Sequence, residues 1–141
     1  MGVNHKRVQR LIQEMGLQVC TKKQRKYRSY KGEQGKIAPN LLQRDFSASK
    51  PNEKWLTDIT EFSVKDEKRY FSPILDCFNN ELIAYGLSRR PNGRLVQEMQ
   101  LQAVKKLPRN ANLILHSDQG IHYQMPSYQR LLAKNRIFQS M

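Results

Sequence analysis

The sequence predicts an α/β fold in which a mixed sheet is flanked by helices and preceded by a basic helical segment. Three observations support this. After residue 54, short apolar runs bounded by turn residues alternate with two stretches of helical periodicity. Their order, three strands and then helix–strand–helix–strand, requires both antiparallel and parallel pairing. The first 50 residues hold 12 basic and 3 acidic side chains, so most of the positive charge precedes the sheet.

The first segment, residues 4–16, is predicted to be a helix because its apolar residues recur every three or four positions. Asn4 is a suitable N-cap and Gly16 a suitable stop. The opposite face carries cations that we expect to contact DNA, namely Lys6, Arg7 and Arg10. A single short helix cannot bury its apolar stripe alone, so we expect it to need a partner outside this chain.

A strongly basic stretch follows the helix and is interleaved with Tyr27 and Tyr30. Cations that neutralise phosphates, next to aromatic rings that stack on bases, are typical of nucleic-acid-binding arms. The cations expected to contact DNA are Lys22, Lys23, Arg25, Lys26, Arg28 and Lys31. The plainer alternative is a disordered, solubilising basic tail. Residues 32–36 lack the spacing and the Ser or Thr of a phosphate-binding loop, so we expect no nucleotide and no small-molecule substrate.

The overall composition narrows the class of protein. The chain has 141 residues and a net charge of +13, which favours a polyanionic partner, most commonly nucleic acid. No apolar run approaches the roughly 18 residues of a membrane helix, and no signal peptide is recognisable, so we expect a cytoplasmic protein without a membrane partner. Cys20 and Cys77 are too few and too far apart for a disulfide framework or a zinc knuckle.

Residues 38–54, rich in Pro and Ser, are expected to be a linker. Apolar runs at 55–62 and 70–77 then predict two strands joined by a charged hairpin connection. A tight turn at Asn79 and Asn80 leads into a third strand at 81–88. Pro73 conflicts with a central strand because it lacks an N–H donor, so it favours a sheet edge or a bulge.

The remaining elements alternate. Helices are predicted at 94–107 and 127–135, where apolar residues face one side. Residues 111–120 form a fourth strand ending at a turn, and residues 136–141 begin a fifth.

Two aspartates carry the predicted chemistry. Asp58 stands in the middle of the first predicted strand, an unfavourable place for an acid, and Asp118 stands just past the end of the fourth. If these strands are neighbours, the two carboxylates converge and need a cation between them. Mg²⁺, or Mn²⁺ in its place, is the cation that such a pair of carboxylates would be expected to bind. The plainer interpretation is a buried Asp bonded to backbone amides.

Other side chains near these motifs have simpler explanations. Glu61 and Asp76 could replace a metal ligand but are more often found in ion pairs or turn caps. His116 and His122 flank Asp118 without the spacing of a zinc site, so we expect them to be second-layer or plain loop residues.

The motifs "WLTDITEF", "YFSPILDCFNNELIAYGLS" and "LILHSDQGIHY" closely resemble the integrase-like core of bacterial insertion-sequence transposases. These are DDE recombinases of the retroviral integrase superfamily with an RNase H-like fold. The opening "VNHKRVQRLIQEMGL" resembles the last helix of the helix-turn-helix segment that precedes such a core. The resemblance therefore implies a DNA-binding segment and linker at 1–45 and a partial catalytic core at 46–141.

The resemblance also implies roles for the two acids. Asp58 and Asp118 match the first and second metal-binding aspartates of the family, which hold two Mg²⁺ ions around a scissile phosphate. In that scheme Asp58 bridges both ions and Asp118 holds one. The family's third acid is a Glu on a helix beyond the point where this chain ends. We therefore expect an RNase H-like sheet that is incomplete, weak metal binding, and little or no catalysis by these residues alone.

The function expected from this resemblance is DNA strand cleavage and strand transfer during transposition, with DNA and a second copy of the chain as partners. A bacterial, nucleoid-associated location follows. Two alternatives remain open at this point: a nucleic-acid-binding protein without catalysis, and an inactive remnant of a mobile element.

Overall fold

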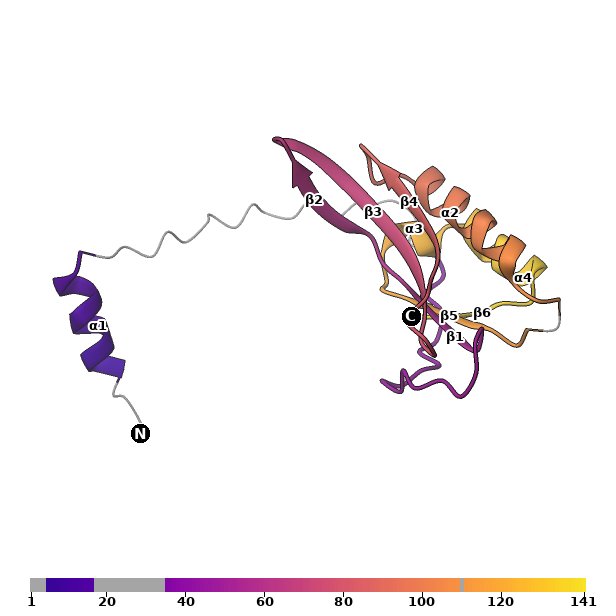
Figure 1. The fold of residues 1–141 in the computed structure, drawn as a ribbon, viewed down its shortest axis with the longest axis horizontal. Helices are drawn as coiled ribbons and strands as arrows, with labels where there is room; N and C mark the ends of the chain where they lie inside the picture. Colours follow the sequence, from indigo (N-terminus) through magenta and orange to yellow (C-terminus); the bar gives the residue numbers. More distant parts are fainter. Residues whose placement is uncertain (1–4, 17–34, 110) are drawn as a thin grey trace. The chain divides into compact units, whose positions relative to one another are not determined.

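The computed structural model describes residues 5–16, 35–109 and 111–141 (Figure 1). The chain divides between Gly32 and Glu33 into two units, which are considered separately below. Among the described residues, no helix is long and apolar enough to cross a membrane.

The first unit contains helix α1, His5–Glu14, which confirms the predicted helix. It stops where expected, because Gly16 adopts a positive φ of 61° and donates its N–H to Gln13 O at 3.1 Å. The predicted N-cap, Asn4, lies outside the described residues. Three apolar side chains on α1 and just after it are exposed in this unit: Val8, Leu11 and Met15.

The second unit is built on a mixed sheet, as predicted, but with six strands where the sequence predicted five. Its strands are β1 (Lys54–Thr57), β2 (Thr60–Val64), β3 (Glu67–Asp76), β4 (Leu82–Ser88), β5 (Ile114–Ser117) and β6 (Phe138–Ser140). Strand β3 pairs antiparallel with β4 on one side and with both β1 and β2 on the other. Strand β5 pairs parallel with β1 and with β6. The sheet therefore runs β4-β3-β1-β5-β6, with β2 continuing the line of β1.

The prediction of one unbroken strand over residues 55–62 is wrong at its centre. The chain leaves the ladder at Asp58 and Ile59 and resumes pairing in β2. The last pair of β1, Thr57 with Ile74, places Asp58 opposite Pro73 when the register is extended by one residue. Because proline has no N–H to donate, the ladder is weakest at that position.

The sequence favours either a sheet edge or a bulge for Pro73. The sheet edge is wrong. Strand β3 has partners on both sides, and Pro73 pairs with Tyr85 of β4. An irregularity of the kind expected for a bulge is found one residue beyond Pro73, where the β3–β4 register shifts between Ile74 and Leu75. The sheet thus accommodates a central proline by interrupting one ladder and shifting the other.

The β2–β3 hairpin is tighter than the charged connection expected from the sequence. Lys65 and Asp66 alone form the turn, with φ values of 47° and 65°. Positive φ at both central residues is characteristic of a type I′ turn, which matches the twist of the flanking strands.

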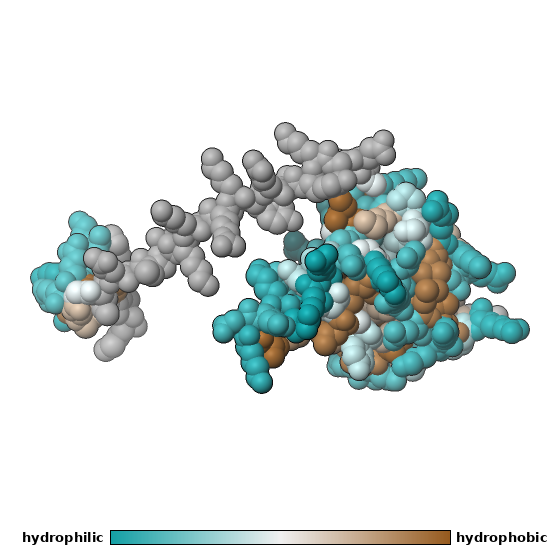
Figure 2. All heavy atoms as spheres, turned by 90° about the horizontal axis from the view of Figure 1, so that it is seen from above, coloured by the Kyte–Doolittle hydropathy of each residue, from teal (hydrophilic) through white to brown (hydrophobic). Residues whose placement is uncertain are grey.

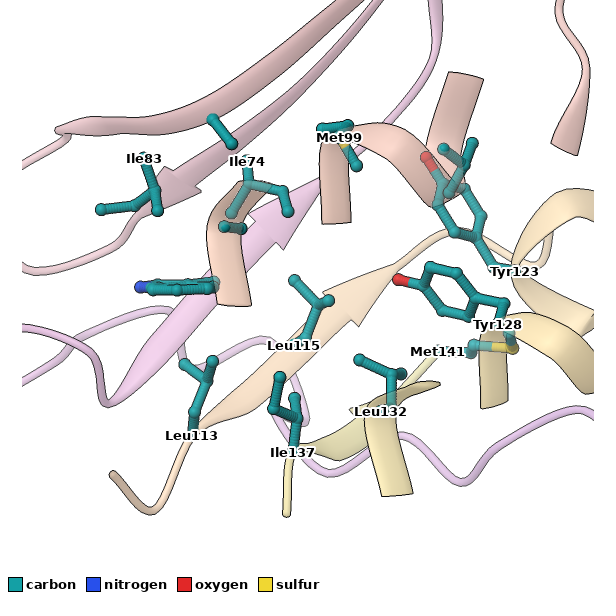
Figure 3. Close-up of a cluster of buried hydrophobic side chains, with 14 residues drawn as sticks. Ile74, Ile83, Met99, Leu113, Leu115, Tyr123, Tyr128, Leu132, Ile137 and Met141 are labelled. Atoms are coloured by element: carbon teal, nitrogen blue, oxygen red, sulfur yellow. The ribbon is translucent and has the colours of Figure 1, made fainter. Parts of the chain in front are cut away.

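Three helices pack on one face of the sheet: α2 (Gly93–Lys106), α3 (Ile121–Gln124) and α4 (Pro126–Lys134). Asn92 is the N-cap of helix α2, and its Oδ1 accepts the N–H of Leu95 at 3.0 Å. The sequence predicted α2 and α4 but not the single turn of α3. Side chains from all three helices and from β1, β3, β4 and β5 form one core (Figure 3). Its larger members include Trp55, Ile74, Met99, Leu115, Tyr123, Tyr128 and Leu132.

Residues 35–53 contain neither helix nor strand, as predicted for a linker, but they pack against the sheet as a strap. The N–H of Leu41 donates to Ser140 Oγ at 2.8 Å, and Leu42 is buried. Phe46 makes an edge contact with the His116 ring, with centroids 6.0 Å apart. The expected boundary between the DNA-binding segment with its linker (1–45) and the partial catalytic core (46–141) stays a prediction.

The opposite face of β3 and β4 carries exposed apolar side chains. Phe71 pairs with Leu87 and Pro73 with Tyr85, so these four side chains share one face. Tyr85 and Leu87 are 55% and 59% exposed. Apolar patches are visible on the surface of this unit (Figure 2).

Candidate functional site

Asp58 and Asp118 leave the sheet side by side at one edge. Strands β1 and β5 are adjacent and parallel, and their last residues, Thr57 and Ser117, are register partners. Each aspartate is the next residue along its strand, at the carboxyl end where open α/β sheets place ligands. Adjacent strands lie about 4.8 Å apart, so the two acids start from backbone positions close together.

Both acids are exposed, which corrects the expectation of a buried mid-strand Asp58. Asp58 Oδ1 accepts its neighbour's N–H, that of Ile59, at 2.7 Å. Asp118 Oδ1 accepts the N–H of Gly120 at 3.0 Å. Within the described residues, neither acid forms a salt bridge. Each carboxylate is thus oriented by one backbone amide, while its second oxygen makes no hydrogen bond with the described residues.

Gly120 leaves room for the Asp118 carboxylate. A Cβ added at Gly120 would lie 2.8 Å from Asp118 Oδ1 and 3.4 Å from Tyr123 Cδ2. The backbone of Gly120 is ordinary, with φ −60° and ψ 143°, so the constraint is space rather than conformation. Any larger residue would displace the carboxylate.

Buried hydroxyl groups lie beneath the acidic edge. Burial, with smaller contributions from the charges of Asp118 and Asp58, raises the pKa of Tyr123 to about 12. Tyr123 thus lies near enough to both carboxylates for their charges to act on its hydroxyl. The hydroxyls of Tyr123 and Thr57 are buried, and neither makes a hydrogen bond of normal geometry with the described residues. Thr57 nevertheless lies close enough to lower the pKa of Tyr123, an effect second only to that of burial.

The two alternative acids are engaged elsewhere. Glu61 accepts hydrogen bonds from Lys68 and from Tyr70 Oη, the latter at 2.8 Å, and these bonds lower its pKa. Asp76 is buried and lies at the far end of β1, paired in register with Trp55. Its carboxylate accepts three hydrogen bonds, from Asn52 N, Trp55 Nε1 and Phe78 N, at 2.7, 3.2 and 2.8 Å. The Asp76 carboxylate therefore stabilises the β3–β4 turn and fixes the Trp55 indole.

The two histidines sit around the end of β5. His116 Nδ1 lies 2.9 Å from Ser140 Oγ, and burial lowers its pKa. Burial also lowers the pKa of His122, against an opposing effect of the Asp118 charge. His122 Nδ1 is buried and makes no hydrogen bond with the described residues. His116 thus links β5 to β6 and to the strap through Ser140 and Phe46.

The residues at this edge suit a hard divalent cation. Two carboxylates with unengaged oxygens match the ligands that Mg²⁺ takes from proteins, which usually number one or two. Within residues 5–16, 35–109 and 111–141, no cluster of three or more His, Cys, Asp or Glu side chains could hold a metal. The edge therefore offers a two-carboxylate site.

The predicted DNA-contacting residues divide into two groups. Lys6, Arg7 and Arg10 lie exposed on α1, where Arg10 also pairs with Glu14 at 3.6 Å. The others lie outside the described residues: Lys22, Lys23, Arg25, Lys26, Arg28 and Lys31.

Sequence reasoning missed Gly120, Thr57 and Tyr123 as parts of the site. The signal for Gly120 was present in "HSDQG", because a glycine two residues after an acid allows a tight turn around its carboxylate. Thr57 and Tyr123 carried no local signal, since their proximity depends on how α3 packs.

The fold is RNase H-like, and it resembles solved retroviral integrases. The human T-cell lymphotropic virus 2 integrase catalytic core, solved with magnesium, superimposes with a TM-score of 0.56 at 21% identity, covering 67% of this chain and 62% of that one. A simian T-cell lymphotropic virus intasome chain gives the same TM-score at 19% identity, covering 81% of this chain and 37% of that one.

Residues 48–141 match the family of integrase core domains, and the chain belongs to this family. An uncharacterized transposase-like protein of Haemophilus influenzae is 58% identical over 139 residues, covering 99% of this chain and 63% of its own length. The putative transposase InsK of insertion sequence IS150, from Escherichia coli, is 53% identical over 139 residues, covering 99% and 49%. The chain thus spans about half to just under two thirds of the length of these relatives.

Proposed function

We propose that this chain acts in DNA transposition and integration, as part of a transposase whose chemistry is metal-dependent DNA strand cleavage and strand transfer. The observation that carries the proposal is the placement of Asp58 and Asp118 at one edge of the sheet, directly after register partners. Membership of the integrase core family and similarity to insertion-sequence transposases support it.

Asp58 and Asp118 would hold Mg²⁺ or Mn²⁺ through the oxygens that their local hydrogen bonds leave free. The bound ion would polarise a scissile phosphate and activate its attacking oxygen. The amides of Ile59 and Gly120 fix the carboxylates before the ion arrives, which limits the rearrangement needed for binding. The exposed edge leaves room for a nucleic-acid backbone.

Two carboxylates alone predict weak metal binding and slow chemistry. A second ion would depend on water and substrate phosphate for its remaining ligands. We therefore expect a polypeptide of residues 1–141 to bind DNA but not to nick supercoiled plasmid at a meaningful rate in Mg²⁺. Nicking that an Asp58→Ala/Asp118→Ala variant abolishes would show that Glu61 or a second chain supplies a third acid.

The DNA contacts are proposed to come largely from residues 1–45. Each phosphate contact contributes a slope of about −0.9 to log K against log salt. Replacing Lys22, Lys23, Arg25 and Lys26 with Ala should weaken binding and flatten that slope in an anisotropy titration. An unchanged slope would favour the alternative of a basic tail that makes no electrostatic contact.

Iron-directed cleavage tests whether the acidic edge faces DNA, even if hydrolysis is slow. Fe²⁺ bound in place of Mg²⁺ generates hydroxyl radicals with ascorbate and peroxide, and these cut any DNA backbone near the ion. We expect localised cuts in bound duplex that disappear in Asp58→Asn/Asp118→Asn. The control is Asp66→Asn, which removes an exposed acid from the β2–β3 turn. Equal cutting by all three proteins would contradict the proposal and favour a non-catalytic DNA-binding protein.

Self-association is a further part of the proposal. The exposed apolar side chains on the free face of β3 and β4, including Tyr85 and Leu87, support it. A solved relative, the human T-cell lymphotropic virus 2 integrase core, is described in dimeric and trimeric forms. Sedimentation velocity should show a concentration-dependent shift that Tyr85→Lys/Leu87→Lys reduces. Because its substrate is DNA, we place the protein at the bacterial nucleoid.

A further inference from the structure

A basic cavity lies at the opposite end of the sheet from the two acids. It has a volume of about 350 Å³ and is lined by the cations Arg109, Lys134 and Arg136 together with Val104 and Leu107. It forms where α2 and α4 end, next to the starts of β5 and β6. Since Asp118 follows the end of β5, the length of that strand separates the cavity from the acidic edge.

The charge around this cavity is uncompensated. Residues 99–141 contain six Lys and Arg but a single acid, Asp118. Within the described residues, Arg109, Lys134 and Arg136 take part in no salt bridge. Glu98, earlier on α2, is already paired with Arg94 at 2.7 Å. Three cations without a counterion favour an anionic ligand.

The basic surface continues beyond the cavity. Lys134 also lines a neighbouring groove of about 320 Å³ between α2 and α4, together with Arg130, Gln97 and Leu101. A surface of this length suits an extended polyanion better than a single small ion.

Arg136 occupies a backbone position that usually belongs to glycine. Helix α4 ends in a Schellman motif, in which Ile137 N–H donates to Leu132 O at 3.0 Å and Arg136 N–H to Ala133 O at 3.1 Å. Arg136 has a φ of 57°, in the left-handed region that glycine adopts without steric cost. A cation at the helix end could interact with the helix dipole, but Lys134 in the last turn already does so. The backbone therefore offers no reason for an arginine here, and glycine could replace it without steric cost.

We propose that this cavity and the adjoining groove bind the phosphodiester backbone of a DNA segment at a distance from the acidic edge. The inference goes beyond the proposed function because it does not use Asp58, Asp118 or a metal ion. The cations would position DNA along the α2–α4 face, and the guanidinium groups of Arg109 and Arg136 suit phosphate oxygens.

The test exploits the backbone of Arg136. Arg136→Gly removes the charge while relieving the positive φ, so its melting temperature should equal or exceed that of the parent. In the chain of residues 1–141, the variant should bind a labelled duplex of arbitrary sequence more weakly than the parent, as measured by anisotropy. The slope of log K against log salt should become shallower by about 0.9. Adding Arg109→Ala and Lys134→Ala should flatten the slope by a similar amount for each.

Lys65→Gly is the matched control, because Lys65 is also a cation at a positive φ, in the β2–β3 turn. It should leave the slope unchanged. An unchanged slope for Arg136→Gly, or an equal loss for Lys65→Gly, would overturn the proposal. Displacement of the duplex by inorganic phosphate at matched ionic strength would indicate a free-anion site, and equal displacement by polyglutamate would indicate an acidic protein partner; either result would also overturn it. Asp58→Asn/Asp118→Asn should keep the Arg136-dependent difference in slope, which separates this inference from the proposed function.

Discussion

Asp58 and Asp118 leave the sheet at the same level, because the residues that precede them, Thr57 and Ser117, are partners in the register of parallel strands. They are 60 positions apart in sequence, yet a single pairing brings them together. Both acids directly follow the last residue of a strand, and Asp58 lies in the two-residue gap between β1 and β2. Their carboxylates are free for a ligand.

The first prediction concerns the metal. Asp58→Asn and Asp118→Asn should each abolish detectable Mn²⁺ binding, measured by calorimetry and by paramagnetic broadening of nearby amide signals. Both side chains are exposed, so the free energy of unfolding should change by no more than about 0.5 kcal/mol. An undiminished Mn²⁺ signal in both variants would move the site elsewhere in the chain.

The second prediction concerns Gly120. Gly120→Ala should lower Mn²⁺ affinity by about tenfold or more, because the new Cβ would displace the Asp118 carboxylate. The φ of −60° suits alanine, so the fold should persist. Gln119→Ala is the control, since it changes the exposed neighbour without adding an atom near the carboxylate. Equal affinities for the two variants would show that Asp118 does not bind the ion in this orientation.

The third prediction separates Asp76 from the metal site. Asp76→Ala should lower the free energy of unfolding by about 3 kcal/mol, because it leaves one buried and two partly buried donors without an acceptor. Asp76→Asn should cost less, since it keeps one acceptor oxygen. Chemical denaturation measures both. Under conditions where the variant is folded, Mn²⁺ affinity should equal that of the parent, and a loss of affinity would reinstate Asp76 as a ligand.

The fourth prediction concerns acid and the strap. Hydrogen bonds from the Ser47 side chain and then Lys54 lower the pKa of Asp45 to about 2, from 3.8. Because the folded pKa is the lower one, the stabilising contribution is present above about pH 3.8 and is lost as pH falls toward 2. A carboxyl-carbon NMR titration should give this midpoint. Ser47→Ala should raise it more than Lys54→Gln, and the reverse order would assign the main effect to the ion pair.

Local pattern was sufficient for much of the fold. The spacing of apolar residues predicted α1, α2 and α4. Gly16 marks the end of α1 and Asn80 the β3–β4 turn, and both adopt the positive φ that such residues tolerate. The two acidic motifs are also local, since each follows an apolar run. The turn at Lys65 and Asp66 carried no such signal, because neither residue is typical of a type I′ turn.

The sequence by itself determined the α/β class, the order of the main elements apart from α3 and the break between β1 and β2, the positive charge of the first 50 residues, and the choice of Asp58 and Asp118 as candidate ligands. These follow from short-range periodicity and residue chemistry. Only the tertiary structure decided that Asp58 lies exposed after β1, that Asp76 is a buried acceptor, and that Arg109 and Arg136 share a cavity. Each of these depends on which distant segments pack together, through the register of β1 with β3 and β5 and the meeting of the ends of α2 and α4, and no local pattern encodes that.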